Sequence, residues 1–246
     1  GGGTAANTAV ALSRLGTNVT MITTVGDDGY GRWVKQDLEN ENIDTCGVHF
    51  LRDTFTPMVM AVIKPDGERM VFVWPPEGGA QNAMQKDHIS PALLSGKDWL
   101  HTTGMCLRAS PSRETILHGM QQARSAGLTV SIDLNMRLEL WGLSPSDRNT
   151  FLQAVELADV VFGNAAEEIQ PLSGESSLEA AVSKLAGDKR TIIARLGARG
   201  AWIFSPKTNC RLPAYEVPIT DTLGAGDAFN SGFIAARLKG HNSQEA

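Results

Sequence analysis

The sequence predicts an α/β fold with a mostly parallel central sheet. Segments with helical spacing alternate with short apolar segments along most of the chain, as is typical of strands covered by helices on both faces. Residues 47–76 depart from this alternation and predict a β-hairpin inserted in the series. We therefore expect a single domain over residues 1–246, with a partial β lid at about 47–76.

Glycines and apolar periodicity define the elements of the first half. The expected elements are, in order, a helix ending near Gly16, a strand at 19–25, a helix at about 31–41, and hairpin strands at 57–63 and 69–74 joined by a turn at 64–68. In the second helix, Trp33, Val34 and Leu38 have core-facing spacing.

The alternation of helices and strands resumes in the second half. We expect strands at 99–103, 128–133, 160–164 and 191–196, helices at 112–126, 149–157 and 178–185, and a closing meander that starts at 201–204. An apolar segment after residue 224 predicts a further helix.

Composition excludes several classes of protein. The net charge of -5 argues against sequence-independent binding of nucleic acid, which needs concentrated Lys and Arg. No apolar segment has the length needed to cross a membrane. The three cysteines are odd in number and far apart, which favours a reducing compartment over disulfides or a zinc site. We expect a cytoplasmic protein without nucleic-acid or membrane partners.

Residues 221–227, Asp-Thr-Leu-Gly-Ala-Gly-Asp, directly precede the last predicted helix. Gly224, Ala225 and Gly226 carry no side chain larger than a methyl group, so a ligand can approach their N–H groups closely. Unpaired N–H donors and the helix dipole make a helix N-terminus suitable for an anion. A carboxylate at Asp227, beside this site, indicates a base that deprotonates a hydroxyl while the amides hold a phosphoryl group.

Polar residues also follow three predicted strands. They are Asp133-Leu134-Asn135-Met136-Arg137, Asn164-Ala165-Ala166-Glu167 and Gly197-Ala198-Arg199-Gly200. Ligands of open parallel sheets bind at the carboxyl ends of strands. Carboxylates for a metal ion, a guanidinium for phosphate and small-residue turns are the requirements of phosphoryl transfer. The sequence contains neither a Walker-type P-loop nor the protein-kinase motifs.

Two motifs carry a resemblance to a known family. Gly2-Gly3-Thr4-Ala5-Ala6-Asn7-Thr8-Ala9, near the start, and residues 221–227 with Ser231-Gly232, near the end, resemble the two signature motifs of the ribokinase-like (PfkB) carbohydrate kinases. The resemblance covers nearly the whole chain and implies a three-layer α/β/α fold with a small β lid. Asp133-x-Asn135-x-Arg137 with Trp141 is similar to the form found in fructokinases and 2-keto-3-deoxygluconate kinases.

The resemblance implies a role for each matched residue. It implies that Asp227 is the catalytic base, that Gly224, Ala225 and Gly226 form the anion hole, and that Gly2, Gly3, Asn7 and Arg137 bind the substrate. It also implies that Asn164 and Glu167 organise Mg²⁺ and the nucleotide phosphates, with Glu167 acting through water. Gly197, Gly200 and Thr222 are implied to lie near the nucleotide. Asp221 is implied to belong to a monovalent-cation site.

Each position also has a purely structural alternative. Asp227 could cap the helix, Asn7 could start one, Glu167 and Glu168 could be solvated first-turn residues, Arg137 could be an ion-pair partner, and Gly197 and Gly200 could be turn glycines.

The sequence departs from the family in several places. Members begin with a strand and a lid segment ahead of the double glycine and extend beyond the last helix with residues that enclose the adenine. The resemblance therefore implies a chain truncated at both ends. The region after the hairpin lacks the Arg typical of ketodeoxygluconate kinases, which counts against an acidic sugar, and Arg195 stands where many members have Thr.

The expected function is the ATP-dependent phosphorylation of a hydroxyl of a small sugar, with Mg²⁺ and K⁺ as cofactors. One alternative is a nucleoside kinase of the same fold, which needs an apolar-aromatic slot for the base, formed by Trp74 or Phe72. A second alternative is a catalytically silent sensor of a sugar or nucleotide. The exposed edge of the lid hairpin could also support a homodimer.

Overall fold

The computed structural model describes residues 1–63, 69–75, 78–218 and 222–246. The predicted hairpin turn at 64–68 and the predicted cation ligand Asp221 lie outside these ranges. The strands are β1 (Thr20–Gly26), β2 (Asp44–Leu51), β3 (Met58–Ile63), β4 (Arg69–Trp74), β5 (Trp99–Thr103), β6 (Thr129–Asp133), β7 (Val160–Asn164), β8 (Thr191–Arg195), β9 (Ala201–Ser205) and β10 (Thr208–Leu212).

Helices connect most of these strands. They are α1 (Thr4–Arg14), α2 (Gly29–Asn40), α3 (Pro91–Leu94), α4 (Ser112–Ser125), α5 (Leu138–Trp141), α6 (Pro145–Leu157), α7 (Gln170–Ser173), α8 (Leu178–Ala186) and α9 (Ala225–Leu238), with a π-helical turn at Ala165–Ile169 and 3₁₀ turns at Ala80–Asn82, Lys86–His88, Gly104–Leu107 and Gly197–Arg199. No helix within the described ranges has the length and apolar character that a membrane span requires.

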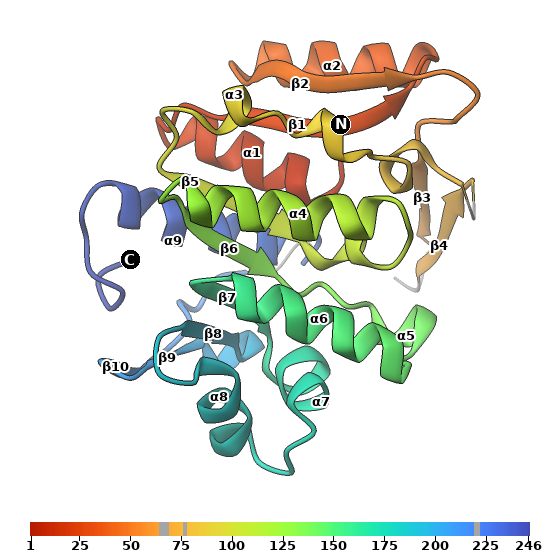
Figure 1. Cartoon of the computed structure of the whole chain (residues 1–246). Coiled ribbons are helices and arrows are strands. Elements are labelled where there is room, and N and C mark those ends of the chain that lie inside the picture. Colours follow the sequence, from red (N-terminus) through yellow and green to blue (C-terminus); the bar gives the residue numbers. More distant parts are fainter. Residues whose placement is uncertain (64–68, 76–77, 219–221) are drawn as a thin grey trace.

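The sheet confirms the predicted α/β class. Six strands lie in the order β10-β9-β8-β7-β6-β5. Strands β5 to β8 pair in parallel, whereas β9 and β10 add the predicted antiparallel meander at one edge. The parallel pair β1–β2 forms a separate two-stranded sheet (Figure 1).

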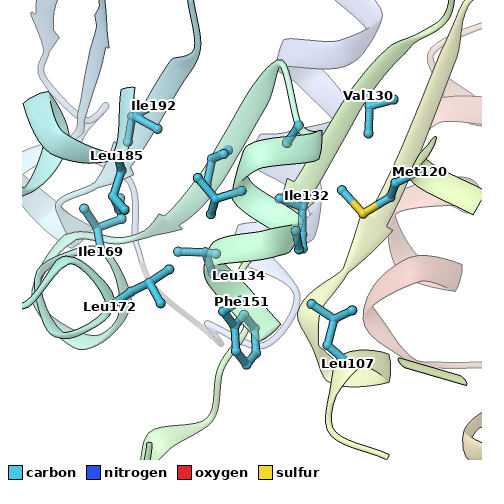
Figure 2. Close-up of a cluster of buried hydrophobic side chains, with 14 of the residues drawn as sticks. Leu107, Met120, Val130, Ile132, Leu134, Phe151, Ile169, Leu172, Leu185 and Ile192 are labelled. Atoms are coloured by element: carbon cyan, nitrogen blue, oxygen red, sulfur yellow. The ribbon is translucent and has the colours of Figure 1, made fainter. Parts of the chain in front are cut away.

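Helices cover both faces of the six-stranded sheet, because its parallel strands are apolar on both sides. On one face, Val130, Ile132 and Ile192 pack with side chains of α4, α6 and α8 (Figure 2). On the other face, Phe162 and Ile193 pack with Leu12 of α1 and with Phe233 and Ile234 of α9. The predicted three layers are therefore present, and α1 and α9 share one of them.

The second helix differs from its prediction in one residue. Trp33 was predicted to face the core, but 55% of its surface is exposed. Gly31 and Leu38 are the buried residues of α2. Trp33 follows Gly31 by two residues, or about 200° around the helix, and so lies on the opposite side.

The region predicted as a lid begins later than expected. Residues 44–51 form β2, which pairs in parallel with β1, so residues 47–51 belong to that sheet. The predicted hairpin itself is present, with β3 antiparallel to β4. Figure 1 shows the two hairpin strands at the side of the molecule, apart from the six-stranded sheet and from the β1–β2 pair.

Candidate active site

Parallel pairing brings the last residues of three strands to one edge of the sheet. Asp133, Asn164 and Arg195 are the last residues of β6, β7 and β8. In the sheet register, Asp133 is opposite Phe162, and Asn164 is opposite Arg195. The carboxyl ends of the three strands therefore meet, as expected for a ligand site in an open parallel sheet.

Arg195 and Asp133 form a buried, two-pronged ion pair at this edge. Nη1 and Nη2 of Arg195 donate to Oδ2 and Oδ1 of Asp133 at 3.0 and 2.8 Å. Asn230 of α9 completes the network, since its Nδ2 donates to Asp133 Oδ2 at 2.7 Å and its Oδ1 accepts from Arg195 at 2.8 Å. Burial disfavours the charged guanidinium, but the charge and hydrogen bonds of Asp133 prevail and raise the pKa of Arg195.

Glu168, rather than Glu167, is the buried carboxylate of the turn after β7. Its Oε1 accepts from the Met136 N–H at 2.7 Å, and its Oε2 accepts from the Asn164 N–H at 2.6 Å. Oε2 also lies 3.7 Å from Arg195. Burial raises the pKa of Glu168, and the negative charge of Asp133 raises it further. Glu168 thereby ties together the ends of β6 and β7.

Asp227 lies in the first turn of α9, at the edge formed by these strand ends. The helix follows Gly224, whose φ of 76° is a left-handed conformation that favours glycine. The Asp227 side chain is buried, with 7% of the residue exposed. Its Oδ2 accepts a hydrogen bond of 2.8 Å from Nδ2 of Asn7 in α1. The first and last signature motifs, 220 residues apart, thus meet at this carboxylate.

The surroundings of Asp227 shift the pKa of its carboxyl group. Burial raises the pKa of its carboxyl. The hydrogen bond from Asn7 and the positive charges of Arg195 and Arg137 lower it, whereas the charge of Asp133 raises it. A raised carboxyl pKa brings a general base closer to the pH at which it works.

The hydrogen bond from Asn7 predicts a shift in pH dependence. A carboxylate accepts a proton only when ionised, so an activity that depends on Asp227 as base is expected to be lost as the pH falls through its pKa. Asn7→Ala removes an influence that lowers this pKa, and we expect the acidic limb of the kcat/KM profile to move to higher pH. Asn40→Ala is the control, because it removes the side-chain hydrogen bond of another helical asparagine, one that is exposed and pairs with Gln36. An Asn7→Ala profile that coincides with the wild-type profile would contradict this role.

His101 is an alternative candidate for a general base, because the charges of Asp133 and Arg195 influence its pKa. Burial lowers the pKa of His101 to about 4. Its Nδ1 lies 2.8 Å from Oγ of Ser131, and its ring packs edge-on against Phe162. These contacts indicate a neutral, structural histidine.

The other residues predicted to bind substrate or nucleotide include four that are exposed. Arg137 is exposed, has a φ of 48° and is close enough to influence Asp227 electrostatically. Gly2, Gly3 and Thr222 are exposed, and the Gly3 carbonyl accepts from the Asn7 N–H at 2.8 Å. Their contacts with substrate or nucleotide stay predictions.

The two glycines after β8 have the geometry of turn residues. Gly197 and Gly200 have φ values of 62° and 91°. A Cβ on Gly200 would lie 1.9 Å from the Leu212 carbonyl oxygen, so the turn requires glycine there. Their predicted proximity to a nucleotide remains a prediction.

Asn164 and Glu167 fit a loosely held metal ion. Asn164 Oδ1 accepts from the N–H groups of Ala166 and Glu167, both at 3.0 Å, and so caps the π-helical turn. Glu167 is exposed. No three His, Cys, Asp or Glu side chains among the described residues are arranged to hold a metal ion. Mg²⁺ commonly binds through one or two carboxylates, substrate phosphates and water, so an exposed Glu167 is compatible with it.

An apolar cavity of about 750 Å³ lies between α2 and the hairpin. Its lining residues are Asp28, Gly29, Tyr30, Trp33, Phe55, Thr56, Met58 and Trp74. A Cβ on Gly1 would lie 3.9 Å from the Trp33 ring, so Gly1 is close to one of the side chains that line this cavity. From there, residues 1–7 lead to the Asn7–Asp227 contact. Trp74, but not Phe72, lines the cavity.

Sequence reasoning missed several members of the site. Glu168 and Asn230 were given no site role, and Arg195 was noted only as a departure from the family. The signal for Asn230 was its spacing of three residues from Asp227, which places both on one face of a helix. None of the three residue pairs in the Arg195–Asp133–Asn230 network is close in sequence, so the network is visible only once the strands pair and α9 packs on the sheet.

Comparisons with known proteins agree with this geometry. The sequence pattern of the pfkB family carbohydrate kinases matches residues 1–246. The chain is 31% identical to the aminoimidazole riboside kinase of Salmonella typhimurium over 95% of its own length and 72% of that protein. It is 30% identical to fructokinase-1 of Zea mays over 98% of its length and 75% of that protein.

Solved structures show the same fold. The fructokinase of Vibrio cholerae O395 with fructose, ADP and calcium ion bound matches 100% of this chain and 78% of its own, with a TM-score of 0.84 and 31% identity. A double mutant of that fructokinase, with fructose, ADP and potassium ion bound, has the same TM-score at 30% identity, over 100% of this chain and 78% of its own.

Proposed function

Since this chain belongs to the pfkB family of carbohydrate kinases, which are phosphotransferases with alcohol acceptors, we propose that it transfers the γ-phosphoryl group of ATP to a hydroxyl of a small sugar. The observation that carries this proposal is the buried Asp227 carboxylate in the first turn of α9, held by Asn7. A carboxylate in a site suited to an anion is unfavourable unless chemistry uses it.

The proposed reaction proceeds in one displacement. Asp227 takes the proton of the sugar hydroxyl, the sugar oxygen forms a bond to the γ-phosphorus, and the bond from that phosphorus to the β–γ bridging oxygen breaks, so that ADP leaves. The backbone N–H groups of Gly224 and Gly226 are proposed to stabilise the charge that develops on the transferred group. The Ala225 N–H donates to the Thr222 carbonyl at 3.2 Å and joins them once that contact opens. The exposed guanidinium of Arg137 adds positive charge from the strand-end side.

The sugar is proposed to lie between the start of α1 and the hairpin. Gly2 and Gly3 precede Asn7, which contacts the base directly. Gly197, Gly200 and Thr222 are proposed to lie along the nucleotide on the other side of the anion hole. The Vibrio fructokinase, which binds fructose and ADP together, supports such a two-ligand arrangement.

Mg²⁺ is the proposed metal ion, held through water by Glu167 near Asn164. When bound, Mg²⁺ supplies positive charge that offsets the charge of the phosphates. We propose K⁺ as an activating ion, with Asp221, outside the described residues, as a ligand, because one related fructokinase structure contains potassium.

Glu167→Gln tests the metal proposal. Because Glu167 would act through water, we expect the Mg²⁺ concentration for half-maximal activity to rise about 10-fold, as for other indirect metal partners. Glu179→Gln is the matched control, since Glu179 is also an exposed first-turn carboxylate. Equal Mg²⁺ requirements in the two variants would exclude Glu167 from the metal site.

The apolar cavity favours a second class of acceptor, a sugar that carries a planar ring. An acceptor with a planar ring attached to its sugar could place that ring against Trp33, Tyr30 and Trp74. The similarity to a riboside kinase supports this candidate. In that case the protein phosphorylates a nucleoside-like compound at the same base.

A panel assay separates these candidates. ADP release would be measured with hexoses, pentoses, keto-acids and nucleosides, against a reaction without acceptor. ADP release that depends on a simple sugar supports the first candidate, and dependence on a nucleoside supports the second. Binding of ATP and acceptor without ADP release would point instead to a silent sensor and would overturn the proposal.

We also propose a homodimer formed through the hairpin. Among the described residues, β3 and β4 pair only with each other, and Val59 and Val73, opposite each other in register, are 68% and 42% exposed. A second copy could extend this sheet with two-fold symmetry. Analytical ultracentrifugation should give a dimer for the wild type and a monomer for Val59→Lys, whereas a monomeric wild type would contradict the proposal.

The proposed setting is the cytoplasm. Cys46, Cys106 and Cys210 are all unpaired, which suits a reducing compartment.

A further inference from the structure

Arg195 is the buried cation of the site, and the family resemblance assigns it no role. It ends β8, and only 19% of its side chain is exposed. Both of its terminal nitrogens donate to Asp133 of β6. A planar guanidinium held by two parallel hydrogen bonds has a fixed orientation. Arg195 is therefore a rigid group at the edge where the substrates are proposed to meet.

The guanidinium lies beside α9 on both sides of Asp227. Nη1 donates to Oδ1 of Asn230 at 2.8 Å, one turn after Asp227. On the other side, a Cβ built on Gly226 would make van der Waals contact with Cζ and Nη1 of Arg195 at 3.4 Å, so the guanidinium faces the turn before Asp227 across the space that glycine leaves open. The start of α9 is thus hydrogen-bonded to Arg195 through Asn230 and lies next to it at Gly226.

Arg195 also supplies positive charge beside the carboxylates near Asp227. Asp133 and Glu168 are buried carboxylates near Arg195. The charged groups that influence Asp227 are Asp133, Arg195 and the exposed Arg137. Without Arg195, Asp133 and Glu168 would lose their neighbouring cation. Of the charged groups that influence Asp227, Arg137 would be the remaining positive one, so the surroundings of Asp227 would become less favourable for a phosphate.

We infer that Arg195 is a positioning residue, which seats the Gly224–Asp227 turn on the ends of β6 and β8 and so aligns Asp227 and the anion-hole amides with the reacting groups. This inference rests on the proposed function for its kinetic part. Its structural part, the fixing of the first turn of α9, does not depend on activity.

Arg195→Lys is the central test, because it keeps the charge but loses the fork that spans Asp133 and Asn230. Arg190→Lys is the matched control. Arg190 is also a buried arginine, which pairs with Glu156 and donates to the Leu185 carbonyl. Hydrogen–deuterium exchange would be measured for the amides of residues 224–230, together with kcat and KM for ATP and acceptor.

We expect Arg195→Lys to speed amide exchange in residues 224–230 and to lower kcat on the order of 100-fold, as for small misplacements of reacting groups. KM should change by less than about threefold, since binding contacts remain. Arg190→Lys should lower the melting temperature but leave the exchange of residues 224–230 and kcat unchanged. A lower melting temperature for Arg195→Lys, with wild-type exchange in this segment and wild-type kcat, would overturn the inference.

Asn230→Ala provides a second variant that leaves the Arg195–Asp133 ion pair intact. It removes the hydrogen bonds that Asn230 of α9 makes with Arg195 and with Asp133, so faster exchange of residues 224–230 is expected here too, with a kcat decrease of about 10-fold or more. Exchange identical to the wild type in Asn230→Ala would also overturn the inference. If the wild type phosphorylates no acceptor, the proposed function fails, and the exchange measurements still decide whether Arg195 fixes the turn.

Discussion

Asp227→Asn is expected to lower kcat by about two to four orders of magnitude in a protein that folds normally. Asn has the shape of Asp but cannot take the proton of the sugar hydroxyl. Its side-chain oxygen can still accept the hydrogen bond from Asn7, so the contact between α1 and α9 is kept. KM for ATP and for the acceptor should change little, because the proton moves only as the transition state forms.

The control for this substitution is Asp27→Asn. Asp27 is exposed and pairs with Arg32 at the surface, so its loss should leave kcat unchanged. Circular dichroism and thermal melting would show that both variants are folded. A folded Asp227→Asn protein with kcat within about threefold of the wild type would remove Asp227 from the role of base.

Asp133→Ala is expected to have the largest effect on stability, a loss of about 3–5 kcal/mol in the free energy of unfolding. Asp133 accepts three hydrogen bonds, two from Arg195 and one from Asn230. Its removal leaves the buried guanidinium without its main partner, and a buried unpaired charge is strongly destabilising. Urea titration at neutral pH measures this difference directly.

Glu179→Ala is the matched control, since it also breaks an Arg–carboxylate pair. Both partners of the Arg211–Glu179 pair are exposed, so water and salt screen the interaction and its loss should barely move the urea midpoint. Equal midpoints for Asp133→Ala and Glu179→Ala would contradict the view that the Asp133 network holds the carboxyl ends of the strands together.

Features that repeat along the chain were predictable from the sequence. The alternation of apolar and helical segments correctly predicted the parallel strands β5 to β8, because buried strands are short apolar segments bounded by polar strand ends. The hairpin of β3 and β4 was equally visible, since two apolar segments flank a turn sequence. The family membership followed from the two glycine-rich motifs, and the comparisons confirm it.

Features that depend on pairing across the chain were not predictable. Strand β2 has a mixed sequence of polar and apolar residues, with Cys46 exposed and Val48 buried. Its sequence alone therefore resembles a loop, and its pairing with β1 identifies it as a strand. The Asn-x-x-Glu spacing drew attention to Glu167, although the π-helical turn buries Glu168 instead. The partners of Arg195 lie 62 and 35 residues away, and no local pattern predicts them.

The most direct test of the central claim is a ³¹P NMR spectrum of the complete reaction. Wild-type protein would be incubated with ATP, Mg²⁺ and the acceptor that gives the fastest ADP release. The proposed chemistry predicts a new phosphate-monoester signal that grows in step with ADP and is absent with Asp227→Asn. Orthophosphate as the only new signal, or a monoester formed equally fast by Asp227→Asn, would contradict phosphorylation of a sugar hydroxyl by this base.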